Sequence, residues 1–175
     1  IANAVAVRRD LSLFQSDKQN ACRLVHAEGD GLPGLIADFY NGVLVLQCHT
    51  PGMHRALPIL TQSFQMALGD MLIGIYDKSS KTLAKNGGEA SQDGWIWGQA
   101  PENHVAIEHG HCFDIDWEQG QKTGFFLDQR ENRALLGRLS QGKKVLNVFS
   151  YTGGFSIYAL KAGATEVHSL DSSQR

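Results

Sequence analysis

Apolar positions along the first two thirds of the chain follow two periods, one typical of strands and one typical of a helix. Leu35 to Tyr40 and Val43 to Cys48 alternate around Asn41-Gly42, a strong signal for a β-hairpin. From His54 to Leu68, apolar residues recur at helical spacing, which predicts an amphipathic helix packed on the sheet. Residues 21–118 are therefore predicted to form an α+β central domain, an antiparallel sheet with a helix.

Shorter apolar runs complete this predicted domain. Further strands are expected at Arg23–Ala27, Met71–Asp77, Val105–Glu108 and Phe113–Asp116, of which the last two form a second hairpin. Between them, Lys78 to Asp93 is rich in Ser, Lys, Asn and Gly, so it is predicted to be a long, mobile loop. Its lysines, together with Trp95 and Trp97, form a weaker candidate for contact with RNA.

A strand, a glycine turn, a helix and a second strand follow near the end of the sequence. Val145 to Phe149 is predicted to be a buried strand, and a helix opens at Phe155 and ends near Gly163. Val167 to Asp171 is the second strand. This order is the opening unit of a Rossmann-like α/β sheet, so residues 119–175 are predicted to be the N-terminal part of such a domain.

The turn between the first strand and the helix is the candidate ligand site. Asp171 falls about twenty residues after the turn begins, where an acidic side chain can accept ribose hydroxyls. The turn has only the paired Gly153 and Gly154 instead of G-x-G-x-x-G, so NAD is disfavoured. Bulky Phe149 and Tyr151 suit a nucleoside without phosphates, such as S-adenosylmethionine. A strand-turn-helix unit without any ligand stays open at this point.

A polar segment joins the two predicted domains. Gly120 to Gly124 is expected to be a flexible linker, and Asp128-x-x-Glu131 matches a capping box for a helix running through Leu139.

Composition narrows the function classes. The 175 residues are 42% hydrophobic, without a signal peptide or an apolar run long enough to span a membrane, so the protein is expected to be cytoplasmic. The three cysteines show no C-x-x-C spacing, and His109, His111 and Cys112 lack a second ligand cluster, so no metal site is predicted.

The net charge argues mildly against RNA as the partner of this protein. The net charge of −2 is not that of a typical nucleic-acid-binding protein, although basic residues could still cluster in space. Those basic residues are Arg8, Arg9, Lys78, Lys81, Lys85, Lys122, Arg130, Arg133, Arg138, Lys143 and Lys144.

Three long motifs resemble one known family. They are CRLVHAEGDGLPGLIAD (22–38), GQKTGFFLDQRENR (120–133) and VLNVFSYTGGF (145–155). Together they resemble the bacterial 23S rRNA cytosine-5 methyltransferases that carry an N-terminal PUA domain, and the match covers nearly all of the chain in consistent order. A related family, which methylates guanine in the same RNA, shares the Phe-Ser-Tyr-Thr-Gly turn, so this turn does not distinguish the two bases.

The resemblance implies a cofactor, a partner and a set of site residues. The cofactor is S-adenosylmethionine, the substrate is 23S rRNA, and a homodimer is suggested. The linker is expected to fold over the methionine part of the cofactor, where Lys122 pairs with its carboxylate. The expected cofactor-binding residues are Lys122, Thr123, Asn147, Phe149, Tyr151, Thr152, Gly153, Gly154 and Asp171.

The resemblance also implies covalent chemistry. A cysteine thiolate adds to C6 of cytosine so that C5 can attack the cofactor's methyl group, and a base then removes the C5 proton. In that family the cysteine and the base lie beyond the position of Arg175, while Cys22, Cys48 and Cys112 are interpreted as core thiols.

The chain is accordingly interpreted as an internal fragment, with residues 1–20 as the end of a preceding linker or helix. It is expected to contain no catalytic residue and to be inactive alone. Two alternatives stay open: an rRNA guanine methyltransferase, and a non-catalytic RNA-binding module with a vestigial cofactor turn.

Overall fold

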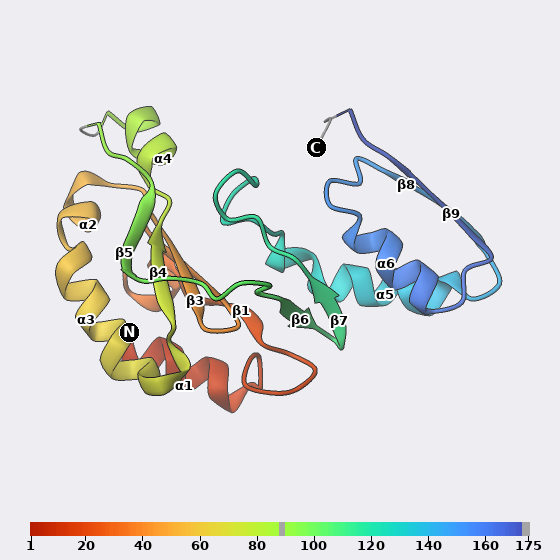
Figure 1. Cartoon of the computed structure of the whole chain (residues 1–175), viewed down its shortest axis with the longest axis horizontal. Coiled ribbons are helices and arrows are strands. Elements are labelled where there is room, and N and C mark those ends of the chain that lie inside the picture. The colour runs from red at the N-terminus through yellow and green to blue at the C-terminus, as the bar shows by residue number, and fades with distance from the viewer. Residues whose placement is uncertain (88–89, 173–175) are drawn as a thin grey trace. The chain divides into compact units, whose positions relative to one another are not determined.

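A computed structural model of the protein describes residues 1–87 and 90–172, which form two compact units (Figure 1). The first unit comprises residues 1–125 and the second begins at Phe126. The division therefore falls seven residues later than the predicted boundary after residue 118, and the predicted linker belongs to the first unit. Within the described residues, we find no helix that is both long enough and apolar enough to cross a membrane.

A five-stranded sheet is the centre of the first unit. Its strands, in spatial order, are β1 (Ala21–His26), β2 (Leu35–Tyr40), β3 (Val43–Cys48), β4 (Gly74–Asp77) and β5 (Gly94–Gly98). The hairpin β2–β3 has the predicted bounds. The sheet is mixed, however, because β3 and β4 pair in parallel. The prediction of a wholly antiparallel sheet was wrong, since the helical segment between these strands is a crossover connection, which parallel pairing requires.

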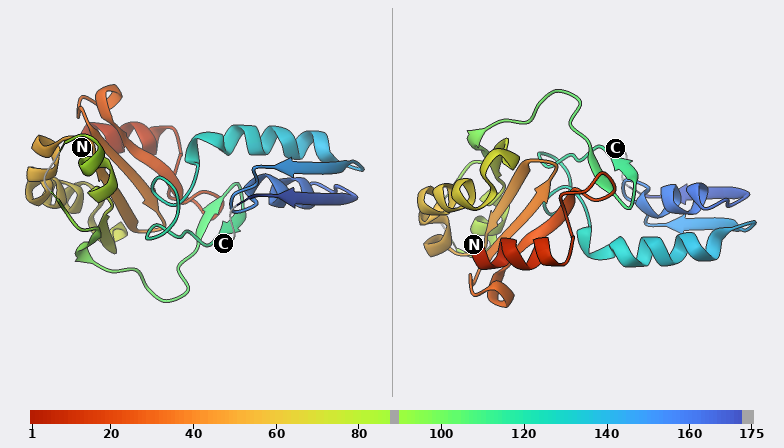
Figure 2. Two further views of the ribbon diagram at one scale, coloured as in Figure 1. Left: turned by 90° about the horizontal axis from the view of Figure 1, so that it is seen from above. Right: turned by 90° about the horizontal axis from the view of Figure 1, so that it is seen from below.

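Helices cover one face of this sheet and close its core. The helix α1 (Ala2–Asp10) packs with α3 (Leu57–Leu68) (Figure 2). Val5, Leu24, Leu44 and Phe64 lie in one apolar cluster. These four side chains are at most 1% exposed. The first residues of the chain are therefore part of the core of the first unit.

The helical segment after β3 and the strand that follows it differ from the sequence prediction. The helix expected from His54 to Leu68 is two helices, because α2 (Pro51–Arg55) ends before Ala56 and α3 begins at Leu57. The strand expected at Met71 starts three residues later, at Gly74, after the 3₁₀ turn η2 (Gly69–Met71). Another 3₁₀ turn, η1 (Ala27–Asp30), follows β1.

The segment predicted as one long loop contains a helix. Within Lys78 to Asp93, residues Ser80–Lys85 form α4, which buries Leu83. The start of α4 is bound by Asp93, whose carboxylate accepts the backbone N–H of Ser80 at 2.8 Å. Residues 88 and 89 of the predicted loop lie outside the described residues. The second hairpin pairs β6 (Ala106–Glu108) with β7 (His111–Phe113), so its second strand begins two residues before the predicted strand and ends at Phe113, where that one was expected to begin.

The second unit contains the predicted strand-helix-strand order. It consists of the 3₁₀ turn η3 (Leu127–Gln129), α5 (Arg130–Ser140), β8 (Lys144–Val148), α6 (Gly154–Lys161) and β9 (Glu166–Leu170). The two strands pair in parallel, α6 packs on them, and α5 packs on α6 (Figure 1). The expected capping box does not form, because Asp128 lies in η3 and the N-cap residue is Gln129 without a side-chain cap bond.

Candidate functional site

The two strands of the second unit end at the same edge of their sheet. Val148 pairs with Leu170 at the carboxyl ends of β8 and β9, and the Ser150 N–H donates to the Leu170 carbonyl at 3.2 Å. The turn to α6 follows β8, and Asp171 follows β9. Ligands of open α/β sheets bind at this edge, outside the carboxyl ends of the strands.

The backbone of the turn is strained. Phe149 and Tyr151 have φ of +59° and +51°, and Gly153, the N-cap of α6, has φ of +78°. Left-handed backbone is costly for bulky side chains and persists where the surrounding structure enforces it, often at ligand-binding sites. The Gly153 N–H donates to the Ser150 carbonyl at 2.8 Å, which closes the turn. A Cβ at Gly153 would have no atom within 4 Å, so glycine is needed at this position for its positive φ and not for lack of space.

Asp171 holds this turn directly. Its Oδ2 accepts the backbone N–H of Tyr151 at 2.8 Å, although the two residues are twenty positions apart in sequence. A carboxylate has two oxygens and about four acceptor positions, so it can accept a backbone N–H and other donors at the same time. The exposed Asp171 can therefore both fix the turn and accept hydroxyl groups of a ligand.

Polar side chains connect β8, α6 and β9 beneath the turn. The Asn147 Nδ2 donates to the Ser156 Oγ at 2.9 Å, and the Ser156 and Ser169 hydroxyls lie 2.6 Å apart. Asn147 was predicted to bind the cofactor, and here its amide contacts a buried serine of the helix. Sequence reasoning missed the two serines, because a hydroxyl on a helix or strand carries no pattern of its own.

Aromatic residues surround the turn in different ways. The ring of Tyr151 meets the ring of Phe126 edge to face, with centroids 5.3 Å apart, whereas Phe149 is 86% exposed. Arg133 lies beneath them, 2% exposed, donates to the Phe126 carbonyl at 3.0 Å and stacks 6.0 Å from the Phe155 centroid. Arg133 thus supports the turn, and as a buried side chain it does not add to a basic surface.

The other two predicted turn residues differ in exposure. Thr152 is exposed, and Gly154 is buried as the first residue of α6. Six of the expected residues, Phe149, Tyr151, Thr152, Gly153, Gly154 and Asp171, thus gather at the turn, with Asn147 on the preceding strand.

The remaining two expected residues, Lys122 and Thr123, belong to the first unit. Thr123 is 0% exposed, donates to the Asp38 Oδ2 at 2.5 Å, and lies 2.9 Å from the Tyr40 hydroxyl. The Thr123 side chain is therefore held inside the first unit by Asp38 and Tyr40. Lys122 is exposed, and its carbonyl accepts the Gln47 amide at 3.2 Å.

The segment from Gly120 to Gly124 is accordingly a fixed loop. The Lys78 Nζ, on a buried side chain, donates to the Gly120 carbonyl at 2.7 Å, and the Gly124 N–H donates to Gln121 at 2.8 Å. Gly124 has φ of +114°, and a Cβ there would lie 2.9 Å from the Asp116 carbonyl oxygen. The expectation of a flexible linker was wrong, because these contacts fix the backbone.

The cysteines are in two environments. Cys22 and Cys48 are buried, and burial raises the pKa of the Cys48 thiol to about 12. Cys112, expected in the core, is exposed on β7. Across residues 1–87 and 90–172, we find no group of three or more His, Cys, Asp or Glu side chains placed to hold a metal ion.

A family model and several relatives match this chain. Residues 22–175 match the family described as S-adenosylmethionine-dependent methyltransferase. A relative from Tolumonas auensis, named ribosomal RNA large subunit methyltransferase I, is 42% identical over 161 residues, which cover 89% of this chain and 39% of the relative. One from Deinococcus radiodurans, named ribosomal RNA large subunit methyltransferase, is 42% identical over 152 residues, covering 85% and 37%. The chain thus spans about two fifths of the length of these relatives.

The solved structures that resemble this chain are also methyltransferases. A putative S-adenosylmethionine-dependent methyltransferase from Streptococcus mutans has a TM-score of 0.84 at 27% identity, covering 99% of this chain and 43% of that one. A putative methyltransferase complexed with S-adenosylhomocysteine (SAH) has a TM-score of 0.82 at 27% identity, covering 98% and 42%. These matches confirm the predicted cofactor, and the chain belongs to the S-adenosylmethionine-dependent methyltransferase family.

Proposed function

We propose that this chain supplies the cofactor-binding turn of an enzyme that methylates ribosomal RNA. The observation that carries the proposal is the bond from Tyr151 N–H to Asp171 at the carboxyl ends of two parallel strands. Relatives that are 42% identical and named ribosomal RNA large subunit methyltransferases support the substrate class.

The residues of the turn fit a nucleoside without phosphates. Asp171 would accept the ribose hydroxyls, and the positive φ angles of Phe149, Tyr151 and Gly153 would shape the backbone that faces the nucleoside. The aromatic rings offer an apolar surface to an adenine base. When bound, the cofactor supplies a methyl group on a positively charged sulfur. The proposed contact of Lys122 with its carboxylate rests on the family resemblance.

The finer chemistry is also a proposal. We infer methylation at C5 of a cytosine in 23S rRNA, through a thiolate that adds to C6 and later leaves. Cys22 and Cys48 are buried, and a thiol as hard to ionise as that of Cys48 is a poor nucleophile. Cys112 is exposed on the hairpin strand β7. By the family resemblance, the nucleophile would come from a segment outside these 175 residues, and the chain alone would be inactive.

The resemblance extends the proposal to the whole protein. We infer an N-terminal PUA domain, a homodimer and a place in the cytoplasm. The shared Phe-Ser-Tyr-Thr-Gly turn also fits a guanine methyltransferase, which nucleoside analysis of methylated rRNA would distinguish.

Calorimetric titration of the chain with SAH, and separately with NAD, tests the cofactor site. We expect SAH to bind, NAD not to bind, and Asp171→Ala to lose most of the SAH affinity. Failure of SAH to bind the folded chain would contradict the proposal and favour a non-catalytic RNA-binding module.

A further inference from the structure

An open pocket of about 760 Å³ in the first unit is lined by three carboxylates. They belong to Asp114, Asp116 and Glu118, on the segment that follows β7. Side chains along this segment alternate between exposed and buried, so the three carboxylates are exposed, whereas Ile115 and Trp117 are 4% and 8% exposed. The pocket therefore combines a concentrated negative charge with buried apolar side chains.

His104 supplies a hydrogen-bond acceptor to the same pocket. The side chain is 9% exposed, and its Nε2 lies 3.1 Å from the carbonyl oxygen of Asn41. A carbonyl oxygen only accepts hydrogen bonds, so Nε2 carries the hydrogen and Nδ1 of the neutral ring is an acceptor. Among the described residues, Nδ1 has no hydrogen-bond partner. A buried acceptor without a partner costs free energy, so it points to a donor that a ligand brings.

Other parts of the first unit hold both walls of this pocket in place. The Asn41 side chain, in the turn between β2 and β3, donates to the carbonyl of the residue after His104 at 3.0 Å. The Gly120 N–H donates to the Asp116 carbonyl at 3.0 Å. The rings of His104 and Trp117 meet edge to face, with centroids 5.2 Å apart. The pocket is therefore preformed, which lowers the cost of ordering it around a ligand.

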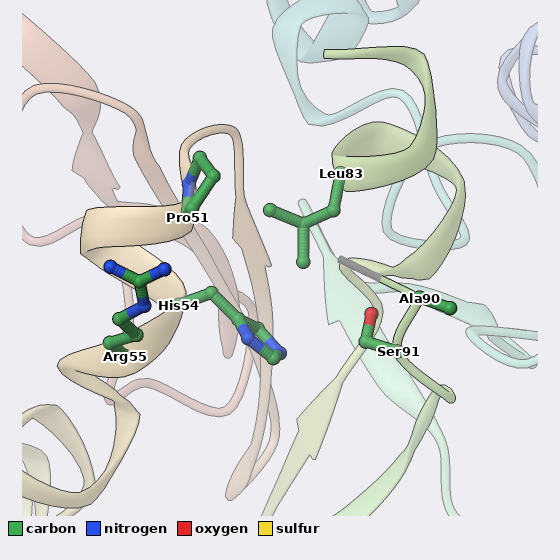
Figure 3. Close-up of a pocket in the computed structure, with 6 residues that line it drawn as sticks. All are labelled: Pro51, His54, Arg55, Leu83, Ala90 and Ser91. Carbon is green, nitrogen blue, oxygen red and sulfur yellow. The ribbon is translucent and has the colours of Figure 1, made fainter. Parts of the chain in front are cut away.

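Another pocket of the same unit has a different character (Figure 3). It has a volume of about 330 Å³, lies between α2 and α4, and its lining includes the basic side chains of His54 and Arg55. The guanidinium of Arg55 points away from His54 and Ser91, so these groups do not converge on one ligand. In the acidic pocket the charges act together. Burial raises the pKa of Tyr76, and nearby carboxylates raise it further, Glu118 first among them.

We propose that the pocket at Asp114, Asp116 and Glu118 binds an organic ammonium group, which also donates a hydrogen bond to the Nδ1 of His104. Hard metal cations prefer oxygen ligands, whereas an ammonium group carries N–H donors that suit both carboxylates and an imidazole. The ring of Trp117 adds a favourable surface for a cation. The carboxylates repel phosphates, so the backbone of RNA does not fit this pocket.

The ammonium group has two natural sources, a free polyamine and the lysine side chain of another protein. NMR titration of the folded chain, followed on the ring signals of His104, separates them. The probes are spermidine and a lysine peptide of the same charge with blocked termini. We expect saturable shifts of the His104 signals, and tighter binding of spermidine or of the peptide identifies the source. Tetramethylammonium, a cation without an N–H donor, should leave these signals almost unchanged.

A variant that combines Asp114→Asn with Glu118→Gln should weaken binding by about tenfold, the combined effect of two exposed ion pairs. Both side chains are exposed, so this variant should fold like the wild type. The matched control combines Asp10→Asn with Asp70→Asn, which removes the same charge from exposed positions outside the pocket lining.

Three results would overturn the proposal. They are the lack of a saturable shift at His104, an equally strong shift with tetramethylammonium, and equal affinities of the pocket variant and the control variant. The proposal goes beyond the proposed function and does not depend on it. SAH binding is measured separately, so a failure at this pocket does not bear on the cofactor turn.

Discussion

Asp171 and Tyr151 are joined by a hydrogen bond from backbone to carboxylate, at 2.8 Å across the end of two parallel strands. The contact means that the residue proposed to bind the ribose also fixes the turn that faces the base. Substitutions of Asp171 therefore test two functions, and the choice of replacement separates them.

Asp171→Ala should weaken SAH binding more than Asp171→Asn. Asparagine keeps one oxygen that can accept the Tyr151 N–H, whereas alanine removes both the turn contact and the ribose contact. Hydrogen bonds to a charged group are worth about 1.5–3 kcal/mol, so we expect at least tenfold weaker binding for the alanine variant. Calorimetry on the three proteins measures this order. Equal affinities of the two variants would show that Asp171 does not hold the turn through Tyr151.

Thr123→Val should destabilise the first unit, whereas Thr123→Ser should not. Valine leaves the buried Asp38 and Tyr40 without the hydroxyl that both contact, at a cost of about 1–3 kcal/mol in the free energy of unfolding. Serine retains that hydroxyl. All three tryptophans, Trp95, Trp97 and Trp117, lie in the first unit, so urea unfolding followed by tryptophan fluorescence reports this unit. Identical urea midpoints for the two variants would contradict the anchoring role.

Cys112 should be the thiol that reacts fastest in the native protein. It is exposed on β7, while Cys22 and Cys48 are buried and burial raises the pKa of Cys48 to about 12. A colorimetric thiol reagent near neutral pH should modify one cysteine rapidly, and Cys112→Ser should abolish that phase. Under denaturing conditions all three cysteines should react. A fast phase that survives in Cys112→Ser would place one of the other thiols at the surface.

Acid should weaken the first unit partly through Asp30. Its hydrogen bonds and ion pair with Arg8 hold its pKa below the usual value of 3.8. The carboxylate therefore contributes its full stability above about pH 4, and that contribution is lost as the pH falls from 3.8 through the lower pKa of the folded state. Asp30→Asn should lower stability at neutral pH and lose less on acidification. Urea midpoints at pH 7 and pH 3 measure the difference, and equal losses would contradict it.

The regular elements of this fold were largely predictable, because their signals are local. The hairpin of β2 and β3 has the bounds predicted from Asn41-Gly42, and the strands of the second unit follow from short apolar runs. The helix α4 was missed because its composition is that of a loop, and one buried leucine and the contact with Asp93 stabilise it. The parallel pairing of β3 and β4 was missed because it depends on the path of the crossover and not on either strand's pattern.

The candidate site was predictable in its position more than in its contacts. Glycine spacing and Asp171 located the turn, but the supporting groups come from distant positions without a pattern, such as Arg133 beneath the aromatic rings. Thr123 illustrates the reverse case. A polar residue between glycines is typical of an exposed loop, yet its hydroxyl is buried and donates a hydrogen bond to the carboxylate of Asp38, 85 residues earlier.

That carboxylate also has a consequence for the order of folding. Asp38 accepts bonds from Arg23, 15 residues before it, and from Thr123, 85 residues after it. The entropic cost of closing a loop grows with the length of the loop. The contact of Asp38 with Arg23 should therefore form early, with the β1–β2 hairpin, and the contact of Asp38 with Thr123 should form late. The loop from Gly120 to Gly124 would then be the last part of the first unit to settle and the first to detach. During synthesis, Asp38 would stay partly exposed until the chain has been extended through Thr123, which completes the first unit.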